Sequence, residues 1–294
     1  MKIYNLGSLN IDYVYAVEHF VTAGETLSSE KMNVFPGGKG LNQSVALSRA
    51  GSKVIHGAVV GDGGEMLCNV LAEAGVDIER IRKTTGSCGH AIIQVDPDGQ
   101  NCIMLFAGTN HRIEEDYIID FLSDAQENDI LLLQNEINNL ALIFEIANKK
   151  QMQIAFNPSP YHRSIQQLPL SYVKWWFCNE IEGAALFGGN TPDEIAEAFR
   201  NRFPHSKLIL TMGAEGSMLL DSDISIRQPI YKVPVLDTTA AGDTFTGFFL
   251  ASITAGKDAA ASLDIASRAA AITVSRAGAS SSIPTMYEVR HTQF

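Results

Sequence analysis

Asp243 follows a run of small residues at the start of a predicted helix, and this segment is the part of the sequence best suited to chemistry. The segment is Asp237-Thr238-Thr239-Ala240-Ala241-Gly242-Asp243-Thr244-Phe245. The first N–H groups of a helix have no partner within it and attract anions. A carboxylate beside them could accept the proton of a hydroxyl that is being phosphorylated, while the amides stabilise charge on the transferred group. The simpler alternative for Asp243 is a contact with the helix dipole.

Residues 37–40 form a second glycine-rich segment, Gly-Gly-Lys-Gly, before another predicted helix. It is not a Walker P-loop, because Gly40 stands where that motif requires Ser or Thr after the lysine. The G-x-G-x-x-G fingerprint of dinucleotide-binding proteins is also missing from the sequence. Paired glycines still let a backbone approach a ligand closely, although a tight turn explains the same residues.

Further polar residues stand where predicted strands end or helices begin. They are Asn10, Asp12, Asn42 and Glu136. Open α/β sheets bind ligands at the carboxyl ends of their strands, and Asn10 and Glu136 follow predicted strands at 2–9 and 130–133. Each residue alone could be a cap or a surface group. Together they favour a site for a polyol, which needs carboxylate and amide partners.

Short apolar strands alternate with helices along most of the chain, which predicts a parallel sheet covered on both faces. The predicted strands include 54–60, 154–156, 175–178 and 208–210, and the predicted helices include 140–147, 241–255 and 259–274. Two stretches, at about 13–35 and 86–107, depart from this alternation and contain strands joined by turns. We expect them to form a small separate β-layer inserted into one α/β domain that covers residues 1–294.

The composition is that of a folded chain, with 46% hydrophobic and 19% charged residues among 294. A formal net charge of −11 argues against a protein that coats nucleic acid. The sequence has no run of about 18 apolar residues, which argues against a membrane span. The four cysteines show neither metal-binding nor redox spacing and are expected to be buried thiols. We therefore expect a cytoplasmic protein.

Taken together, these segments resemble the ribokinase family of carbohydrate kinases, the PfkB superfamily. Residues 37–43 (Gly-Gly-Lys-Gly-Leu-Asn-Gln) and 237–245 match two signatures of the family, and residues 157–160, 179–182 and 211–216 follow in the family's order. The resemblance implies an α/β fold, a three-layer ribokinase-like sandwich with a mostly parallel central sheet. It also implies that the inserted strands form a β-lid that covers the sugar and often makes a dimer interface.

The resemblance implies a role for each matching residue. Asp243 would be the catalytic base, and Ala240, Ala241 and Gly242 would form the anion hole. The sugar would contact Asn10, Asp12, Gly38, Lys39, Asn42, Glu136 and Asp243. ATP and Mg²⁺ would lie near Asn179, Glu182, Thr211, Gly213, Gly216 and Gly242, with Glu182 acting through water. An activating K⁺ would lie among Asp237, Thr239, Thr273, Arg276, Gly278 and Ser282, several of them using backbone carbonyls.

The predicted reaction is ATP-dependent phosphorylation of a primary hydroxyl of a pentose, with O5 of D-ribose favoured because the sugar-contact residues match ribokinases closely. The alternative within the family is a kinase that acts on a nucleoside or another sugar. A non-catalytic sugar-binding regulator is a third hypothesis, which the intact Gly242–Asp243 pair disfavours. An NAD-dependent oxidoreductase would need the missing fingerprint. The expected partners are the sugar, ATP and a second copy of the chain, without nucleic acid or membrane.

Overall fold

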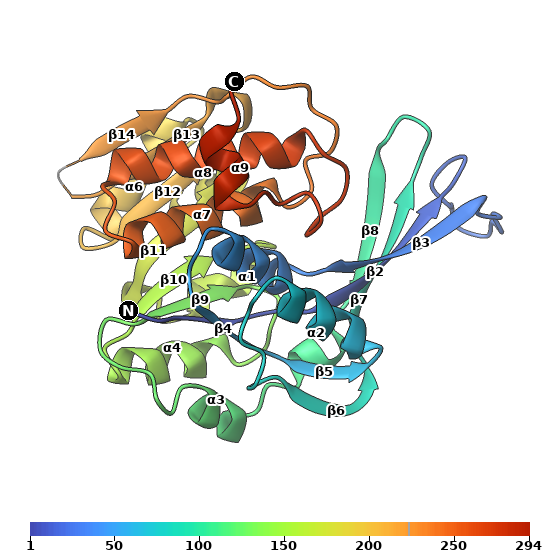
Figure 1. Ribbon diagram of the computed structural model, residues 1–294, viewed down its shortest axis with the longest axis horizontal. Coiled ribbons are helices and arrows are strands. Elements are labelled where there is room, and N and C mark those ends of the chain that lie inside the picture. The colour runs from blue at the N-terminus through green and yellow to red at the C-terminus, as the bar shows by residue number, and fades with distance from the viewer. Residues whose placement is uncertain (223) are drawn as a thin grey trace.

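The computed structural model describes residues 1–222 and 224–294, and within these residues eight strands form a central sheet (Figure 1). In spatial order the strands are β14 (Ser225–Gln228), β13 (Ser217–Leu220), β12 (Lys207–Thr211), β11 (Val173–Asn179), β10 (Gln153–Asn157), β9 (Ile130–Gln134), β1 (Ile3–Leu6) and β4 (Val54–Gly57). Those from β12 to β4 are parallel, whereas β13 and β14 add an antiparallel edge. The prediction of a mostly parallel central sheet is confirmed.

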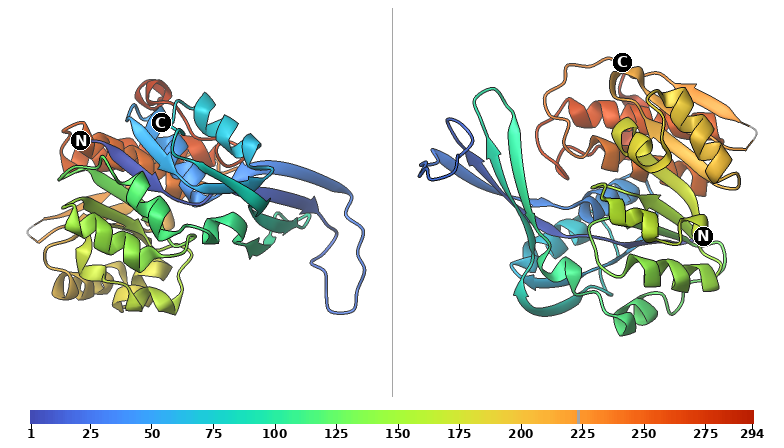
Figure 2. Two further views of the ribbon diagram at one scale, coloured as in Figure 1. Left: turned by 90° about the horizontal axis from the view of Figure 1, so that it is seen from below. Right: turned by 180° about the vertical axis from the view of Figure 1, so that it is seen from behind.

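Helices cover both faces of this sheet (Figures 1 and 2). One face packs against α3 (Glu115–Phe121), α4 (Leu140–Lys149), α5 (Glu180–Phe187) and α6 (Pro192–Arg202). The other face packs against α1 (Lys39–Arg49), α2 (Gly64–Glu73), α7 (Ala241–Thr254), α8 (Ala259–Val274) and α9 (Met286–His291). Successive strand residues enter alternate cores, since Tyr4 and Leu6 belong to one and Ile3 to the other. The three-layer sandwich is therefore confirmed.

Short 3₁₀ helices complete the described elements. They span Gly108–His111, Arg163–Gln167, Leu170–Tyr172 and Gly213–Glu215. None of the helices within residues 1–222 and 224–294 combines the length and the apolar character that crossing a membrane requires.

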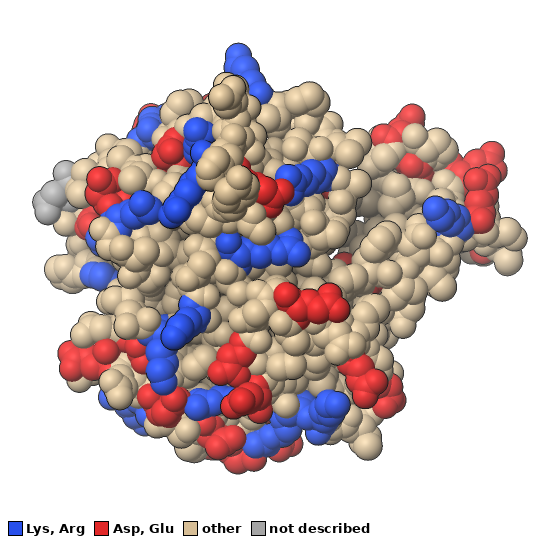
Figure 3. Space-filling model, in the orientation of Figure 1, with Lys and Arg blue, Asp and Glu red and all other residues tan. Residues whose placement is uncertain are grey.

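A second sheet stands away from the sandwich and is called the projecting sheet here (Figures 1 and 3). It contains β3 (Lys31–Gly37), β2 (Asn10–Ala16), β7 (Gly89–Val95) and β8 (Asn101–Phe106), in that order. Strands β2 and β7 pair in parallel, and β3 and β8 pair with them antiparallel. Figure 3 shows acidic side chains gathered at its outer end. The strands expected outside the alternation are therefore in a separate sheet, as predicted.

The single strand expected at 54–60 is wrong, because the chain leaves the central sheet at Ala58. Strand β4 ends at Gly57, and β5 (Val59–Asp62) pairs with β6 (Arg82–Ser87) in a small sheet of its own. The Ala58 carbonyl accepts hydrogen bonds from the Tyr117 hydroxyl (3.0 Å) and the Arg82 N–H (2.9 Å). These contacts from distant segments redirect the run Val-Ile-His-Gly-Ala-Val-Val, which the alternation of strands and helices alone presents as one strand.

The projecting sheet joins the sandwich at two adjacent points. Strand β2 begins at Asn10, shortly after β1, and β3 ends at Gly37, opposite Asn10 in the ladder. Gly38 then turns the chain into α1 with a φ of +95°, a conformation that glycine adopts without strain. A side chain at Gly38 would also approach the Asn10 N atom to 3.0 Å. The root of the projecting sheet is therefore tightly packed backbone.

Candidate active site

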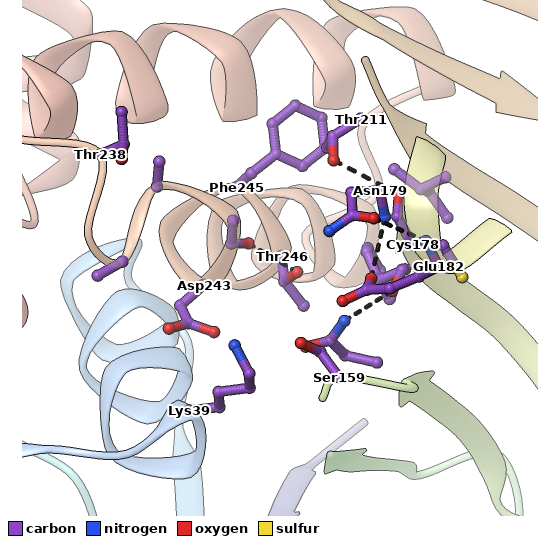
Figure 4. Close-up of a pocket in the computed structure, with 16 residues that line it drawn as sticks. Lys39, Ser159, Cys178, Asn179, Glu182, Thr211, Thr238, Asp243, Phe245 and Thr246 are labelled. Carbon is purple, nitrogen blue, oxygen red and sulfur yellow. Dashed lines mark hydrogen bonds between the residues drawn. The ribbon is translucent and has the colours of Figure 1, made fainter. Parts of the chain in front are cut away.

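A cavity of about 240 Å³ lies where the parallel strands end and α7 begins (Figure 4). Asn157, Asn179 and Thr211 are the last residues of three adjacent parallel strands, and all three line it. The start of α7 forms the opposite wall. The remaining lining residues are Lys39, Ser159, Phe177, Cys178, Glu182, Ile209, Thr238, Ala240, Ala241, Gly242, Asp243, Phe245 and Thr246. The cavity therefore occupies the ligand position that open α/β sheets favour.

Asp243 presents a buried carboxylate to this cavity from the first turn of α7. It is 7% exposed, and α1 contacts both of its oxygens. Asn42 Nδ2 donates to Oδ2 over 3.0 Å, and Gln43 Nε2 donates to Oδ1 over 2.8 Å. Figure 4 shows the Lys39 ammonium pointing toward the same carboxylate. A carboxylate held this way is positioned to accept a proton from a ligand in the cavity.

The backbone at the start of α7 is shaped for an anion. Ala240 precedes the helix with a φ of +61°, in the left-handed region, and no side chain caps the helix. Gly242 lines the cavity, and a Cβ built on it would meet no atom within 4 Å. The N–H of Ala241 donates to the Thr238 carbonyl over 3.3 Å, so this amide is partly engaged within the turn. An anion therefore has open access at Gly242, where the N–H groups of a helix lack internal partners.

Lys39 connects the cavity to the root of the projecting sheet. Burial lowers the pKa of the Lys39 ammonium, but the carboxylates of Asp243, Glu136 and Glu182 raise it, and the net effect is a raised pKa. The Lys39 backbone N–H donates to Glu136 Oε2 over 3.0 Å, and the Ser8 hydroxyl donates to the same oxygen. Burial is the main reason that the pKa of Glu136 is raised. Lys39 is therefore a charged centre among three acids.

Asn10 and Asp12 lie on β2, near Lys39 and Glu136. They are not among the residues that line the cavity. Asn10 is buried and accepts a hydrogen bond from Asn110 Nδ2 over 2.7 Å. Burial, together with the Glu136 carboxylate, raises the pKa of Asp12 to about 7. A side chain at Gly37 would collide with the Asp12 carboxylate, since a Cβ there would be 2.0 Å from Oδ2. The predicted sugar residues thus form one polar group between the two sheets.

We expect Asp12→Asn to stabilise the sugar-free protein, and to do so more strongly at high pH. The folded pKa of Asp12 lies near 7 and the unfolded value near 3.8. Between these values the folded chain binds more protons than the unfolded chain, so native stability falls as pH rises through this window. Asparagine imitates the protonated acid. At about 1.4 kcal/mol per pKa unit, the advantage of the variant grows by roughly 3 kcal/mol between pH 4.5 and pH 8.

Urea unfolding of both proteins at the two pH values measures this difference. Glu30→Gln is the control, because it removes one negative charge from an exposed position between β2 and β3. The control is expected to show no comparable pH-dependent gain. An Asp12→Asn protein that is less stable than the native protein at pH 8 would contradict the argument.

Asn179 and Glu182 form the wall of the cavity at the start of α5. They make a capping box, in which the Glu182 N–H donates to Asn179 Oδ1 over 2.8 Å and the Asn179 N–H donates to Glu182 Oε2 over 3.1 Å. The capping box gives the buried Glu182 carboxylate a structural role at the start of α5. The same carboxylate also borders the cavity (Figure 4). Carboxylate and amide oxygens are the donors that Mg²⁺ prefers, usually together with water and phosphate. These residues fit a magnesium ion that arrives with a nucleotide.

Gly213 and Gly216 lie beside the cavity without lining it. They belong to the turn between β12 and β13, where both have positive φ values of +49° and +96°. A Cβ at Gly216 would be 2.1 Å from the Gln228 carbonyl oxygen. Thr211, at the end of β12, does line the cavity. The turn glycines therefore shape the loop that follows Thr211.

The residues predicted for a monovalent cation gather around Asp237. Its carboxylate accepts hydrogen bonds from the N–H groups of Thr239 and Gly278, both over 2.9 Å. Burial raises the pKa of Asp237, but the hydrogen bonds from Thr239 and Gly278 together lower it by more than burial raises it. The net pKa is therefore lowered. The side chains of Thr273, Arg276 and Ser282 are bonded elsewhere, to Thr244 and Ala269, to Glu288, and to Ala279 respectively. A cation among them would be bound by backbone carbonyls, as K⁺ accepts oxygen ligands of this kind.

Sequence reasoning assigned no role to several residues that the structure brings to the site. Gln43 bonds directly to Asp243, and Asn157 lines the cavity. The position of Asn157 in the sequence could have indicated a place in the site, because Asn157 ends a parallel strand, as Asn179 and Thr211 do. Gln43 ends the segment 37–43 that resembles a family signature, but nothing near it in the sequence indicates a bond to a residue 200 positions away.

Known proteins share this architecture over nearly their whole length. The model of the pfkB family of carbohydrate kinases matches residues 2–286. A ribokinase from Haemophilus influenzae is 33% identical over 292 residues, which cover 96% of this chain and 95% of the relative. A deoxyribokinase from Salmonella typhi is 28% identical, with 97% and 96% covered. The solved structure of Arabidopsis thaliana ribokinase complexed with ribose and ATP has a TM-score of 0.89 at 26% identity, covering 98% of this chain and 97% of that one.

Proposed function

Because the chain belongs to the pfkB family of carbohydrate kinases, we propose that it transfers the γ-phosphoryl group of ATP to the O5 hydroxyl of D-ribose. The observation that carries this proposal is the pairing of the buried Asp243 carboxylate with the open helix start at Gly242 in one cavity. A base beside an anion site is what phosphoryl transfer to a hydroxyl requires. The ribokinase complexed with ribose and ATP supports both substrates.

In the proposed reaction, Asp243 accepts the proton of the sugar hydroxyl as its oxygen bonds to the γ-phosphorus. The bond between that phosphorus and the bridging oxygen breaks, and ADP leaves with this oxygen. Backbone N–H groups at Ala240, Ala241 and Gly242 stabilise the charge on the transferred group. When Mg²⁺ is bound, it offsets the negative charge of the phosphates. Asn179 and Glu182 are the residues suited to hold it, with Glu182 acting through water.

The two substrates approach from opposite sides of Lys39. The sugar is proposed to contact Asn10, Asp12, Gly38, Lys39, Asn42 and Glu136 at the root of the projecting sheet. ATP is proposed to lie along Thr211 and the turn that contains Gly213 and Gly216. K⁺ is proposed to bind the loops joined by Asp237 and Gly278, using carbonyls of Thr239, Thr273, Arg276, Gly278 and Ser282. These loops precede α7 and follow α8, so the cation would stabilise the start of α7.

An assay of ADP release with a panel of acceptors tests the function. The panel contains ribose, 2-deoxyribose, fructose, adenosine and pseudouridine, each with Mg²⁺ and with or without K⁺. We expect the highest kcat/KM with ribose and a higher rate with K⁺. The deoxyribokinase relative makes 2-deoxyribose the main rival, and preference for it would correct the substrate while leaving the chemistry unchanged. ADP release with none of the sugars or nucleosides would overturn the kinase proposal.

We further propose that two copies associate through the projecting sheet. Strand β8 exposes four consecutive apolar side chains, Ile103, Met104, Leu105 and Phe106, which are each 52–63% exposed. An apolar edge strand of this kind is a common interaction surface. The native chain is expected to sediment as a dimer, and Leu105→Glu as a monomer. Ile119→Glu, at an equally exposed apolar position on α3, is the control that should remain dimeric.

A cytoplasmic location is proposed as well. All four cysteines are free thiols, as expected in a reducing compartment, which also supplies ATP; Cys68, Cys88 and Cys178 are buried as expected, whereas Cys102 is exposed because it lies on the edge strand β8. Fractionation of the source cells, with the chain followed by an antibody, tests this location.

A further inference from the structure

We propose that Gln43 is a positioning residue for phosphoryl transfer, which fixes the direction in which Asp243 presents its carboxylate, and that Gln134 in turn fixes Gln43. This inference rests on the proposed kinase function and adds to it two residues from α1 and β9. Neither residue is among those that line the cavity in the described part of the chain. They are therefore expected to act through Asp243 and not on the substrates.

Gln43 makes the shorter of the two hydrogen bonds that α1 donates to the Asp243 carboxylate. Its Nε2 donates to Asp243 Oδ1 over 2.8 Å and also to Asn157 Oδ1 over 3.2 Å, whereas Asn42 Nδ2 donates to Asp243 Oδ2 over 3.0 Å. Gln43 is fully buried, so water does not compete for this bond. Asn42 also lies at the sugar side of the site. Gln43 is therefore the contact whose removal disturbs Asp243 while the proposed sugar residues stay in place.

The orientation of the Gln43 amide is fixed at both ends. A carboxylate only accepts hydrogen bonds, so Nε2 of Gln43 must face Asp243. Its Oε1 accepts from Gln134 Nε2 over 2.7 Å, and Gln134 Nε2 also donates to Asn5 Oδ1 over 3.0 Å. Asn5 is itself fixed, because its Nδ2 donates to the Gly40 carbonyl over 2.9 Å and to Ser44 Oγ over 2.8 Å. A rotated Gln43 amide would place oxygen against oxygen at Asp243.

Gln134 is a buried amide at the end of β9. It is 1% exposed, and within residues 1–222 and 224–294 its Oε1 has no hydrogen-bond partner. A buried acceptor without a partner is destabilising, but an apolar side chain here would also remove the donor to Gln43 Oε1 and Asn5 Oδ1. The backbone is also adapted to this side chain, because a Cβ at Gly7 would be 2.3 Å from Gln134 Oε1. A buried amide whose donor group orients a second amide against Asp243 points to a role in the reaction.

The test measures kcat, both KM values and unfolding for Gln43→Met, Gln134→Met and the double variant. We expect Gln43→Met to lower kcat about 10- to 100-fold, the factor typical of one hydrogen bond to a charged group. The KM values for ribose and ATP should stay within about threefold, because the proposed substrate contacts remain. Gln134→Met should lower kcat about three- to tenfold and should also lose stability, because the buried Gln43 Oε1 and Asn5 Oδ1 lose this donor. The double variant should match Gln43→Met, because both changes act through the same contact.

Gln153→Met is the matched control. Gln153 begins β10, at the opposite end of the sheet from the cavity, and its Oε1 accepts a hydrogen bond from Trp175 Nε1 over 3.0 Å. This variant should lose stability and keep its kcat. Native kcat in both Gln43→Met and Gln134→Met would overturn the inference, as would a double variant whose loss is the product of the two single losses.

The outcomes separate this inference from the function on which it rests. If the native chain releases no ADP with any acceptor, the proposed function fails. If the native chain is active and the variants are equally active, only the inference fails. If Gln43→Met does not fold, the kcat of Gln134→Met alone tests the inference. This variant keeps the hydrogen bond between Gln43 and Asp243 and removes the bond that orients the Gln43 amide.

Discussion

Asp243→Asn is expected to lower kcat by roughly 10²- to 10⁴-fold, the range that a general base contributes. Asparagine has nearly the shape of aspartate but cannot accept the proton of the sugar hydroxyl. Ribose should still bind, because its other proposed contacts lie at the root of the projecting sheet and on α1. Single-turnover assays measure the chemical step, and calorimetric titration with ribose measures binding. Near-native turnover would remove Asp243 from the role of base.

This variant carries a structural effect that the assay must separate from the chemical one. Both neighbours of the carboxylate, Asn42 and Gln43, are donors, so the amide of an asparagine would oppose one of them donor to donor. We expect a loss of about 1–3 kcal/mol in the free energy of unfolding. Circular dichroism at the assay temperature establishes that the variant is folded. Asp243→Ala, which introduces no donor, should lose activity to a similar extent.

Gly242→Ala is expected to lower ATP turnover about 100-fold, comparable with the loss of one oxyanion-hole donor, while the unliganded protein becomes slightly more stable. The added methyl group meets no protein atom within 4 Å, so it extends into the cavity where the phosphoryl group is proposed to lie. Alanine inside a helix is also favoured over glycine by about 0.5–1 kcal/mol. ADP has no γ-phosphoryl group, so its binding should change little. Thermal unfolding, ADP titration and kcat measure the three effects.

Gly247→Ala is the matched control on the same helix. A Cβ there would lie 2.5 Å from Ala46 Cβ and 2.8 Å from the Leu47 N atom, where α7 crosses α1. This variant should therefore be less stable than the native protein. The molecules that remain folded should have a kcat close to the native value. A Gly242→Ala protein with unchanged turnover would show that the phosphoryl group does not approach this glycine.

Local signals predicted the elements that position the site. The alanine-rich helix at 259–274 has the bounds that its composition predicted, and α7 begins at Ala241 as expected. The hairpin at 86–107 followed from alternating strands around a turn, and its strands pair as β7 and β8. These features depend on residues close in sequence, such as helix formers, turn residues and strand periodicity.

Contacts between distant segments could not be predicted in the same way. The break at Ala58 depends on hydrogen bonds from Tyr117 and Arg82, which nothing in the run 54–60 indicates. The orientation of the Asp243 carboxylate depends on α1, some 200 residues away. The resemblance to a family indicated which residues matter, whereas the buried amides that orient them became visible only in the folded chain.

The root of the projecting sheet has a consequence for how substrate preference can change. The proposed sugar contacts Asn10 and Asp12 lie at the start of β2, and Gly38 and Lys39 directly follow β3, so the root of this sheet carries several of the residues proposed to bind the sugar. A change in the tilt of the sheet, including one that the proposed association at β8 would impose, is therefore expected to move these residues together. Exchanging the whole sheet with that of a deoxyribokinase relative is therefore expected to transfer discrimination at the 2-position of the sugar, although most of the exchanged residues lie outside the proposed sugar contacts.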